Sequence, residues 1–290
     1  MQDRLVEWTE VQGHPGWAVC AVFDGHGINN DTVNHVTANV VPTIESILGD
    51  ETKARHDPEK VLVAAFSRIT IHLQNLANNP CYGRETSGCT ASVLLTDGIV
   101  VAMANLGDST TMLVDVTDVD NNKVSLASIL FGQEYAHHRQ TATIRTPSTE
   151  RDIVLKKLFQ GKVEVRRPTP GGKEVFCLVG GERYIGVAGA FGDYNNTLSM
   201  CLHRVPVITM AELKKGREYI IFQASDGLTD CLEQILPNHQ WNKYLCKRNT
   251  VEEIMATIKL VARGTRIWDN TAFHVIFNVS RSVIGENNTR

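Results

Sequence analysis

The sequence lacks the features that mark several protein classes. No pair of cysteines has the Cys-Xaa-Xaa-Cys spacing of a zinc or redox site, and most of the seven cysteines stand in apolar runs. We interpret them as reduced core thiols, which predicts a reducing intracellular compartment such as the cytoplasm or nucleus and does not exclude an organelle. We find no signal peptide and no apolar run long enough to span a bilayer.

An excess of charge of one sign is also absent. The formal net charge is -3 over 290 residues, so nothing predicts a nucleic-acid partner. Hydrophobic residues make up 42% of the chain and charged residues 21%, which is ordinary for a globular protein with a large core. Without repeats or linkers, we expect one domain over residues 1–281 and a polar tail at 282–290.

One stretch near the start combines a strand with chemistry. The run from Val19 to Phe23 has the length and residue types of a buried strand, and it ends abruptly in Asp24-Gly25-His26-Gly27. The two glycines let the backbone turn sharply and come close to whatever Asp24 binds. A carboxylate at the end of a stiff strand is well placed to bind a cation. Read alone, the segment is more simply a strand followed by an ordinary Asp-Gly turn.

The same arrangement recurs along the chain. Asp108, Asp226 and Asp269 each stand at an end of another strand-like run. Like charges repel, so carboxylates that converge in a fold need cations between them. A site made only of oxygen ligands suits Mg²⁺ or Mn²⁺ better than zinc.

Hydrophobic periodicity predicts the elements around these acids. Helical spacing predicts one helix over 31–48, which Pro42 would kink or split, and a second that starts at Pro58. Consecutive strands joined by short turns favour antiparallel sheets, with Asp97 as a turn residue rather than a ligand. The other predicted strands form one hairpin over 91–103 with its turn at 96–98, a second hairpin of 110–116 and 123–130 across a turn at 120–122, and a final strand over 271–277. Further helices are predicted over 150–159, 229–236 and 251–263.

Six segments, in this order along most of the chain, carry a family resemblance. They are Phe23–Gly27, Ser87–Ala91, Asn105–Ser109, Ala190–Asp193, Ser225–Asp230 and Asp269-Asn270. Together they resemble the motifs of the metal-dependent protein phosphatases of the protein phosphatase 2C type. Each match is weak alone, and six in the family's order are strong. The resemblance implies an α+β fold: a four-layer α-β-β-α sandwich of two antiparallel sheets packed face to face and flanked by helices.

The resemblance also implies an activity and a cofactor. The expected reaction is hydrolysis of phosphoserine and phosphothreonine in phosphoproteins by a metal-bound hydroxide, with two Mg²⁺ or Mn²⁺ ions and a third, weaker site. Asp24 would bridge the two main ions, and Asp226 would share one of them. His26 would protonate the leaving alkoxide, a role suited to imidazole near neutral pH. The implied ligands of the main ions are Asp24, Gly25 (through its carbonyl), Asp226 and Asp269. Asp108 and Asp230 would hold the weaker ion through water or position the nucleophile.

The opening segment departs from the family. There the resemblance implies a phosphate-binding arginine and a metal-ligating glutamate, but those positions hold Leu5 and Thr9. Arg4 and Glu10 lie one residue away, and we retain them as the candidate phosphate-binding and metal-ligating residues, although a one-residue slip turns a strand side chain to the opposite face. Together with Ile28 and Gly189, these departures leave an alternative open. That alternative is a catalytically impaired or inactive phosphatase-like subunit that binds or scaffolds a larger complex.

Overall fold

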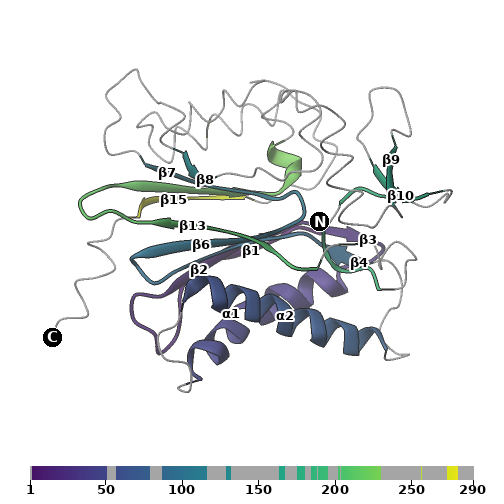
Figure 1. The fold of residues 1–290 in the computed structure, drawn as a ribbon, viewed down its shortest axis with the longest axis horizontal. Coiled ribbons are helices and arrows are strands. Elements are labelled where there is room, and N and C mark those ends of the chain that lie inside the picture. The colour runs from purple at the N-terminus through teal and green to yellow at the C-terminus, as the bar shows by residue number, and fades with distance from the viewer. Residues whose placement is uncertain are drawn as a thin grey trace.

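Two antiparallel sheets lie one above the other in the computed structural model, and a pair of helices covers the outer face of one of them (Figure 1). The sandwich predicted from the sequence is therefore confirmed. The structure describes residues 2–50, 57–78, 87–115, 129–131, 163–166, 175–179, 184–187, 189–194, 202, 204–229, 256 and 273–279.

The sheet beside the helices has five strands in the order β1-β2-β5-β6-β13. Nearly every residue of its central strands is buried, as expected for a sheet that is covered on both faces. The strand at one edge, β1, carries a bulge between Val6 and Thr9, where its register against β2 shifts by one residue. The bounds are Arg4–Glu10 for β1, Ala18–Phe23 for β2, Ala91–Thr96 for β5, Val100–Leu106 for β6 and Val207–Glu212 for β13.

The second sheet has four strands in the order β15-β14-β7-β8. Its bounds are Thr110–Asp115 for β7, Ile129–Phe131 for β8, Tyr219–Ala224 for β14 and Phe273–Val279 for β15. Buried Cys20, Leu94 and Met103 of the first sheet share a cluster with Leu113 and Tyr219 of the second. This cluster fills the space between the sheets, and Cys20 and Cys89 within the described region are buried free thiols.

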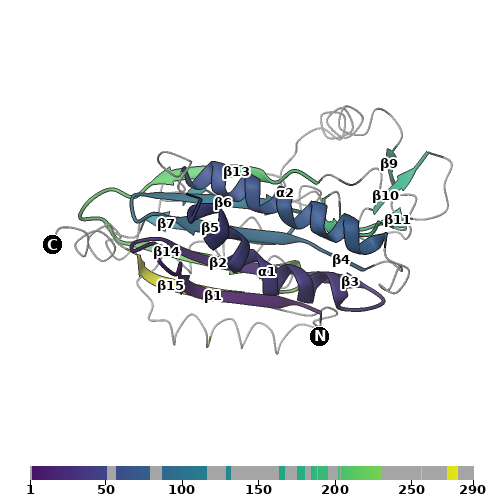
Figure 2. The same ribbon diagram turned by 90° about the horizontal axis from the view of Figure 1, so that it is seen from below.

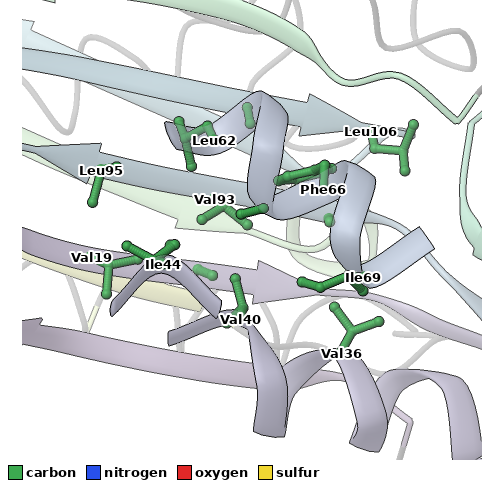
Figure 3. Packing of buried hydrophobic residues seen from close by; sticks show 14 of the residues in the cluster. Val19, Val36, Val40, Ile44, Leu62, Phe66, Ile69, Val93, Leu95 and Leu106 are labelled. Atoms are coloured by element: carbon green, nitrogen blue, oxygen red, sulfur yellow. The ribbon is translucent and has the colours of Figure 1, made fainter. Parts of the chain in front are cut away.

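The two helices lie side by side across the first sheet (Figure 2). Helix α2 (Pro58–Ala77) begins with proline at its first position, and the Asp57 side chain accepts a hydrogen bond from the Glu59 amide. Helix α1 (Asp31–Leu48) is one continuous helix with Pro42 inside it, so the helix is not split there, and the alternative of a kink stays a prediction. Buried residues on both sides of the proline keep one face of α1 packed on the core, which outweighs the lost hydrogen bond. Figure 3 shows this packing between Val36, Val40 and Ile44 of α1, Leu62, Phe66 and Ile69 of α2, and the sheet.

Two small sheets complete the described part of the chain. One has the order β12-β4-β3 and joins segments that are far apart in sequence, with β4 pairing His26 to Gly88 and Cys89 to Phe191. Its bounds are Gly25–Gly27 for β3, Ser87–Cys89 for β4 and Phe191–Gly192 for β12. The other comprises β9 (Val163–Arg166), β10 (Val175–Leu178) and β11 (Tyr184–Ile185).

Several predictions fall outside the described residues. They are the helices at 150–159 and 251–263, the turn at 120–122, and the candidate ligands Asp230 and Asp269. The helix predicted at 229–236 begins earlier, because residues 226–229 are already helical. The tight hairpin between β5 and β6 is confirmed, with Asp97 Oδ1 accepting hydrogen bonds from the Ile99 and Val100 amides.

Candidate metal centre

Three aspartates that are remote in sequence meet in the fold. Asp24 follows β2 of the first sheet, Asp108 lies in the connection from β6 to β7, and Asp226 follows β14 of the second sheet. Each offers one carboxylate oxygen to a group in which all these oxygens lie within 4.8 Å of one another. The three acids thus sit where the two sheets meet at their ends, as the strand-end pattern predicted.

Without a cation, keeping these carboxylates ionised and close together is unfavourable in free energy. Asp108 is 3% exposed and Asp226 is 8% exposed. Burial raises the pKa of the Asp24 carboxyl far above its usual range, and the charge of Asp226, a hydrogen bond from its side chain, and the charges of Asp3 and Asp108 raise it further. A divalent cation among these oxygens would remove the repulsion, and a set of carboxylates alone fits Mg²⁺ or Mn²⁺. The residues present therefore fit the metal that the resemblance implies.

A fourth acid, Asp3, belongs to the same neighbourhood and was missed in the sequence. It is 4% exposed, and its charge acts on Asp24. The register of β1 explains its place: Arg4 lies opposite Phe23, so Asp3 just before β1 comes beside Asp24 just after β2. The available signal was an acid directly before a strand that pairs antiparallel with the strand leading to Asp24.

The same register places Glu10 too far from the acidic cluster to be a metal ligand. Glu10 is exposed and lies opposite Ala18, six residues before Asp24. At about 3.3 Å per residue, that puts Glu10 roughly 20 Å from the cluster. The prediction that Glu10 is a metal ligand is therefore wrong. The acid of the opening segment that lies beside Asp24 is Asp3.

Arg4, the candidate phosphate ligand, lies close to the cluster in sequence but is turned toward α1. Its Nε donates to Asn34 Oδ1 at 3.0 Å and its guanidinium donates to the Asp3 carbonyl at 2.9 Å. The position that the resemblance gives to the phosphate-binding arginine holds Leu5, which is 36% exposed. A role for Arg4 in phosphate binding stays a prediction.

His26, the predicted proton donor, is held by Asp193. His26 Nε2 and Asp193 Oδ2 lie 2.7 Å apart, and Asp193 is 4% exposed while His26 is 29% exposed. Two backbone features aim Asp193 at the imidazole: Gly192 has φ +82°, where a Cβ would overlap the Ser87 carbonyl, and Asp193 itself has φ +56°. Asp193 lies in a motif that the sequence singled out, but its contact with His26 spans 167 residues and has no local signal.

Of the remaining predicted site residues, the structure describes Gly25 but not Asp230 or Asp269. Gly25 is buried, and a Cβ there would lie 2.6 Å from the Gln2 carbonyl, so close packing rather than turn geometry requires this glycine. Ile28, where the family has glycine, is 71% exposed beside β3. Asp230 and Asp269 lie outside the described residues, and their roles as ligands stay predictions.

Comparison with known proteins agrees with this geometry. A family model described as Protein phosphatase 2C matches residues 1–125, and probable protein phosphatase 2C 34 of Arabidopsis thaliana is 23% identical over 281 residues, covering 92% of this chain and 72% of that protein. The chain is thus similar to protein phosphatases 2C over most of its length, and its first 125 residues match the model of that family. This family is metal-dependent in general, in agreement with the acidic cluster.

Other protein phosphatase 2C relatives match over shorter parts. Probable protein phosphatase 2C 72 of Arabidopsis thaliana is 26% identical over 223 residues, which is 74% of this chain. Probable protein phosphatase 2C 35 of the same plant is 31% identical over 133 residues, which is 46% of this chain. The chain spans 61% of the first of these two relatives and 35% of the second.

Solved structures show the protein phosphatase 2C fold as well. The serine-threonine phosphatase 2C of Toxoplasma gondii superposes with a TM-score of 0.59 at 14% identity, covering 95% of this chain and 94% of that chain. A sex determining protein of C. elegans superposes with a TM-score of 0.64 at 16% identity, covering 98% of this chain and 62% of that chain. Within the described part of this chain, neither helix combines the length and hydrophobicity that crossing a membrane needs.

Proposed function

We propose that this chain is a serine/threonine protein phosphatase that uses Mg²⁺ or Mn²⁺ to hydrolyse phosphoserine and phosphothreonine in phosphoproteins. The observation that carries the proposal is the convergence of Asp24, Asp108 and Asp226, with oxygens within 4.8 Å of one another, at the junction of the two sheets. The match of residues 1–125 to the family model and the similarity to protein phosphatases 2C support the reaction class.

Each acid has a definable task in this proposal. Asp24 and Asp226 would hold the principal ion together, because their carboxylate oxygens lie within 4.8 Å of each other. Asp108 would hold a further ion or position the attacking water from the connection between the sheets. Divalent cations at such a centre activate water as a nucleophile and neutralise charge on the phosphoryl group. Asp230 and Asp269 are proposed as additional ligands on the strength of the resemblance.

His26 would supply the proton for the leaving serine or threonine oxygen. Asp193 Oδ2 accepts a hydrogen bond from His26 Nε2 and so fixes the orientation of the ring that would act as general acid. His26 lies two residues from Asp24 along the chain, so a phosphoryl group at the acidic cluster would be within its reach. We therefore assign Asp193 as the positioning residue of the general acid.

A second candidate function rests on the residues at the expected phosphate-binding position. Arg4 is engaged with Asn34 and the Asp3 carbonyl, and Leu5 occupies the position that the resemblance gives to the arginine. A charge-assisted hydrogen bond to phosphate contributes a few kcal/mol, so its loss would weaken turnover greatly and leave metal binding intact. This observation favours a phosphatase-like binding or scaffold subunit as the alternative.

Phosphate release from a small aryl phosphate tests the two functions together with metal binding. The wild-type protein is assayed with and without Mn²⁺ beside Asp226→Asn, and the melting temperature is followed in the same solutions. Asp97→Asn is the matched control, since it makes the same change in a strand-end aspartate whose Oδ1 serves only a turn.

Three outcomes separate the possibilities. Release that needs Mn²⁺, disappears in Asp226→Asn and persists in Asp97→Asn supports the enzyme. A rise in melting temperature with Mn²⁺ but no release supports the binding subunit. If Mn²⁺ changes neither quantity, the acidic cluster is not a metal site and the proposal fails.

A further inference from the structure

Thr90 joins the parts of the acidic cluster that come from different elements. It is 1% exposed and lies between β4 and β5, immediately behind Asp24. The Thr90 amide donates to the Asp24 carbonyl at 2.9 Å, and the Asp24 amide donates to Thr90 Oγ1 at 3.3 Å. The backbone of Asp24 is thus held from both sides by one residue.

The same side chain reaches the turn that carries Asp108. Thr90 Oγ1 and Ser109 Oγ are 2.6 Å apart, and Ser109 is fully buried. A Cβ on Gly107, which has φ +98°, would lie 2.7 Å from the Thr90 methyl carbon, so the methyl group packs directly against the turn. The hydroxyl of Thr90 therefore touches the residue after Asp108, and its methyl touches the residue before it.

These contacts fix the spacing between two carboxylates that come from separate strand ends. Metal affinity depends on that spacing, because a cation gains from both oxygens only when they are placed at its coordination distance. We infer that Thr90 is a positioning residue that sets the separation of Asp24 from Asp108 and thereby the affinity of this site for a divalent cation. The inference rests on the proposed metal site.

A second buried hydroxyl pair provides a matched control. Ser92, two residues along β5, hydrogen-bonds Thr111, and Gln223 of β14 donates to both the Thr111 hydroxyl and the Ser92 carbonyl. This group is as deeply buried as Thr90 and also links the two sheets, but it contacts the strands rather than the aspartate turns. Removing its hydroxyl should cost stability without moving the acids.

The test measures Mn²⁺ affinity by isothermal titration calorimetry and the free energy of unfolding without metal, on the full chain. Thr90→Val, which keeps the shape and loses the hydroxyl, should bind Mn²⁺ about 10-fold more weakly than the wild type. Thr90→Ser, which keeps the hydroxyl, should stay within about twofold of the wild type. Ser92→Ala should lose stability to a similar extent as Thr90→Val, because both remove a buried hydroxyl, and should keep its Mn²⁺ affinity within about twofold of the wild type.

The outcomes distinguish this inference from the proposed function. If the wild type binds Mn²⁺ and Thr90→Val binds it equally well, Thr90 is merely structural and the inference is overturned. An equal loss of affinity in Ser92→Ala overturns it as well, because any weakening of the sheets would then suffice. If Thr90→Val does not fold, Ser109→Ala removes the other end of the same hydrogen bond and should show the same 10-fold loss. Absence of Mn²⁺ binding in the wild type refutes the metal site itself.

Discussion

The contact between His26 and Asp193 can be broken from a third position without touching either residue. Gly88 of β4 lies against both, and a Cβ there would come closer than 3.0 Å to Asp193 Oδ2 and to His26 Nε2. The φ of Gly88 lies outside the left-handed region, so alanine fits the backbone and only the side chains must move. We expect Gly88→Ala to separate the imidazole from the carboxylate.

The size of the effect follows from the type of bond that is lost. A hydrogen bond to a charged group contributes about 1.5–3 kcal/mol. Because this bond positions the ring for proton transfer, we expect its loss to lower kcat roughly 10- to 150-fold at about 1.4 kcal/mol per factor of ten. The metal ligands are not touched, so the Mn²⁺ dissociation constant should stay within about twofold of the wild type.

Steady-state release of phosphate with saturating Mn²⁺ gives kcat, and calorimetry gives the Mn²⁺ affinity of the same samples. Gly49→Ala, at the end of α1 with φ -72°, is the control for adding a methyl group to a glycine away from the site. An unchanged kcat in Gly88→Ala would refute the role that we assign to the His26–Asp193 pair. A Gly88→Ala effect that persists in a His26→Ala background would do so too, because no pair is then left to break.

Two further predictions concern the register of β1 and a histidine pair between the helices. Asp3→Asn should weaken Mn²⁺ binding about 10-fold by removing a charge next to Asp24, whereas Glu10→Gln at the other end of the strand should leave it unchanged, and calorimetric titrations showing the reverse would contradict the register. His35 stands edge-on to His72 with ring centroids 4.7 Å apart, and burial, reinforced by the charge of His72, lowers its pKa. Because the unfolded chain then binds the proton more tightly, stability is full above the unfolded pKa of 6.5 and declines as pH falls below it. Denaturant titrations from pH 5 to 7 should show a flatter profile for His35→Gln, and an identical slope would exclude His35 as the cause.

Much of the fold followed from local patterns. Asp57 and Pro58 carry the start signal of α2 in adjacent residues, and the hairpin through Asp97 shows its turn chemistry in three. Such signals act within a few residues, so a single sequence contains them completely. Pro42 does not split α1, because the packing of α1 against the core is a tertiary effect that outweighs one missing hydrogen bond.

The site was predictable to the extent that strand ends mark it. Asp24, Asp108 and Asp226 were recognised because each ends an apolar run, and the structure brings them together. Asp3 was missed, and Glu10 wrongly preferred, because a strand of period two gives no internal sign of its register, which is set by pairing with β2 and by a bulge. The partnership of Asp193 with His26 depends on a backbone with positive φ and on sheet pairing across the chain, neither of which a local pattern specifies.

Because the clustered aspartates come from both layers, an ion bound at the proposed site would also take part in folding. In the unfolded chain the aspartates are not close together, so the ion would bind the native state and not the unfolded state. By mass action, a free concentration 100 times the dissociation constant would then add about 2.7 kcal/mol to the free energy of unfolding. A shortage of the ion would therefore lower the stability of the fold as well as the activity. The lifetime of the folded protein would then depend on the concentration of its cation.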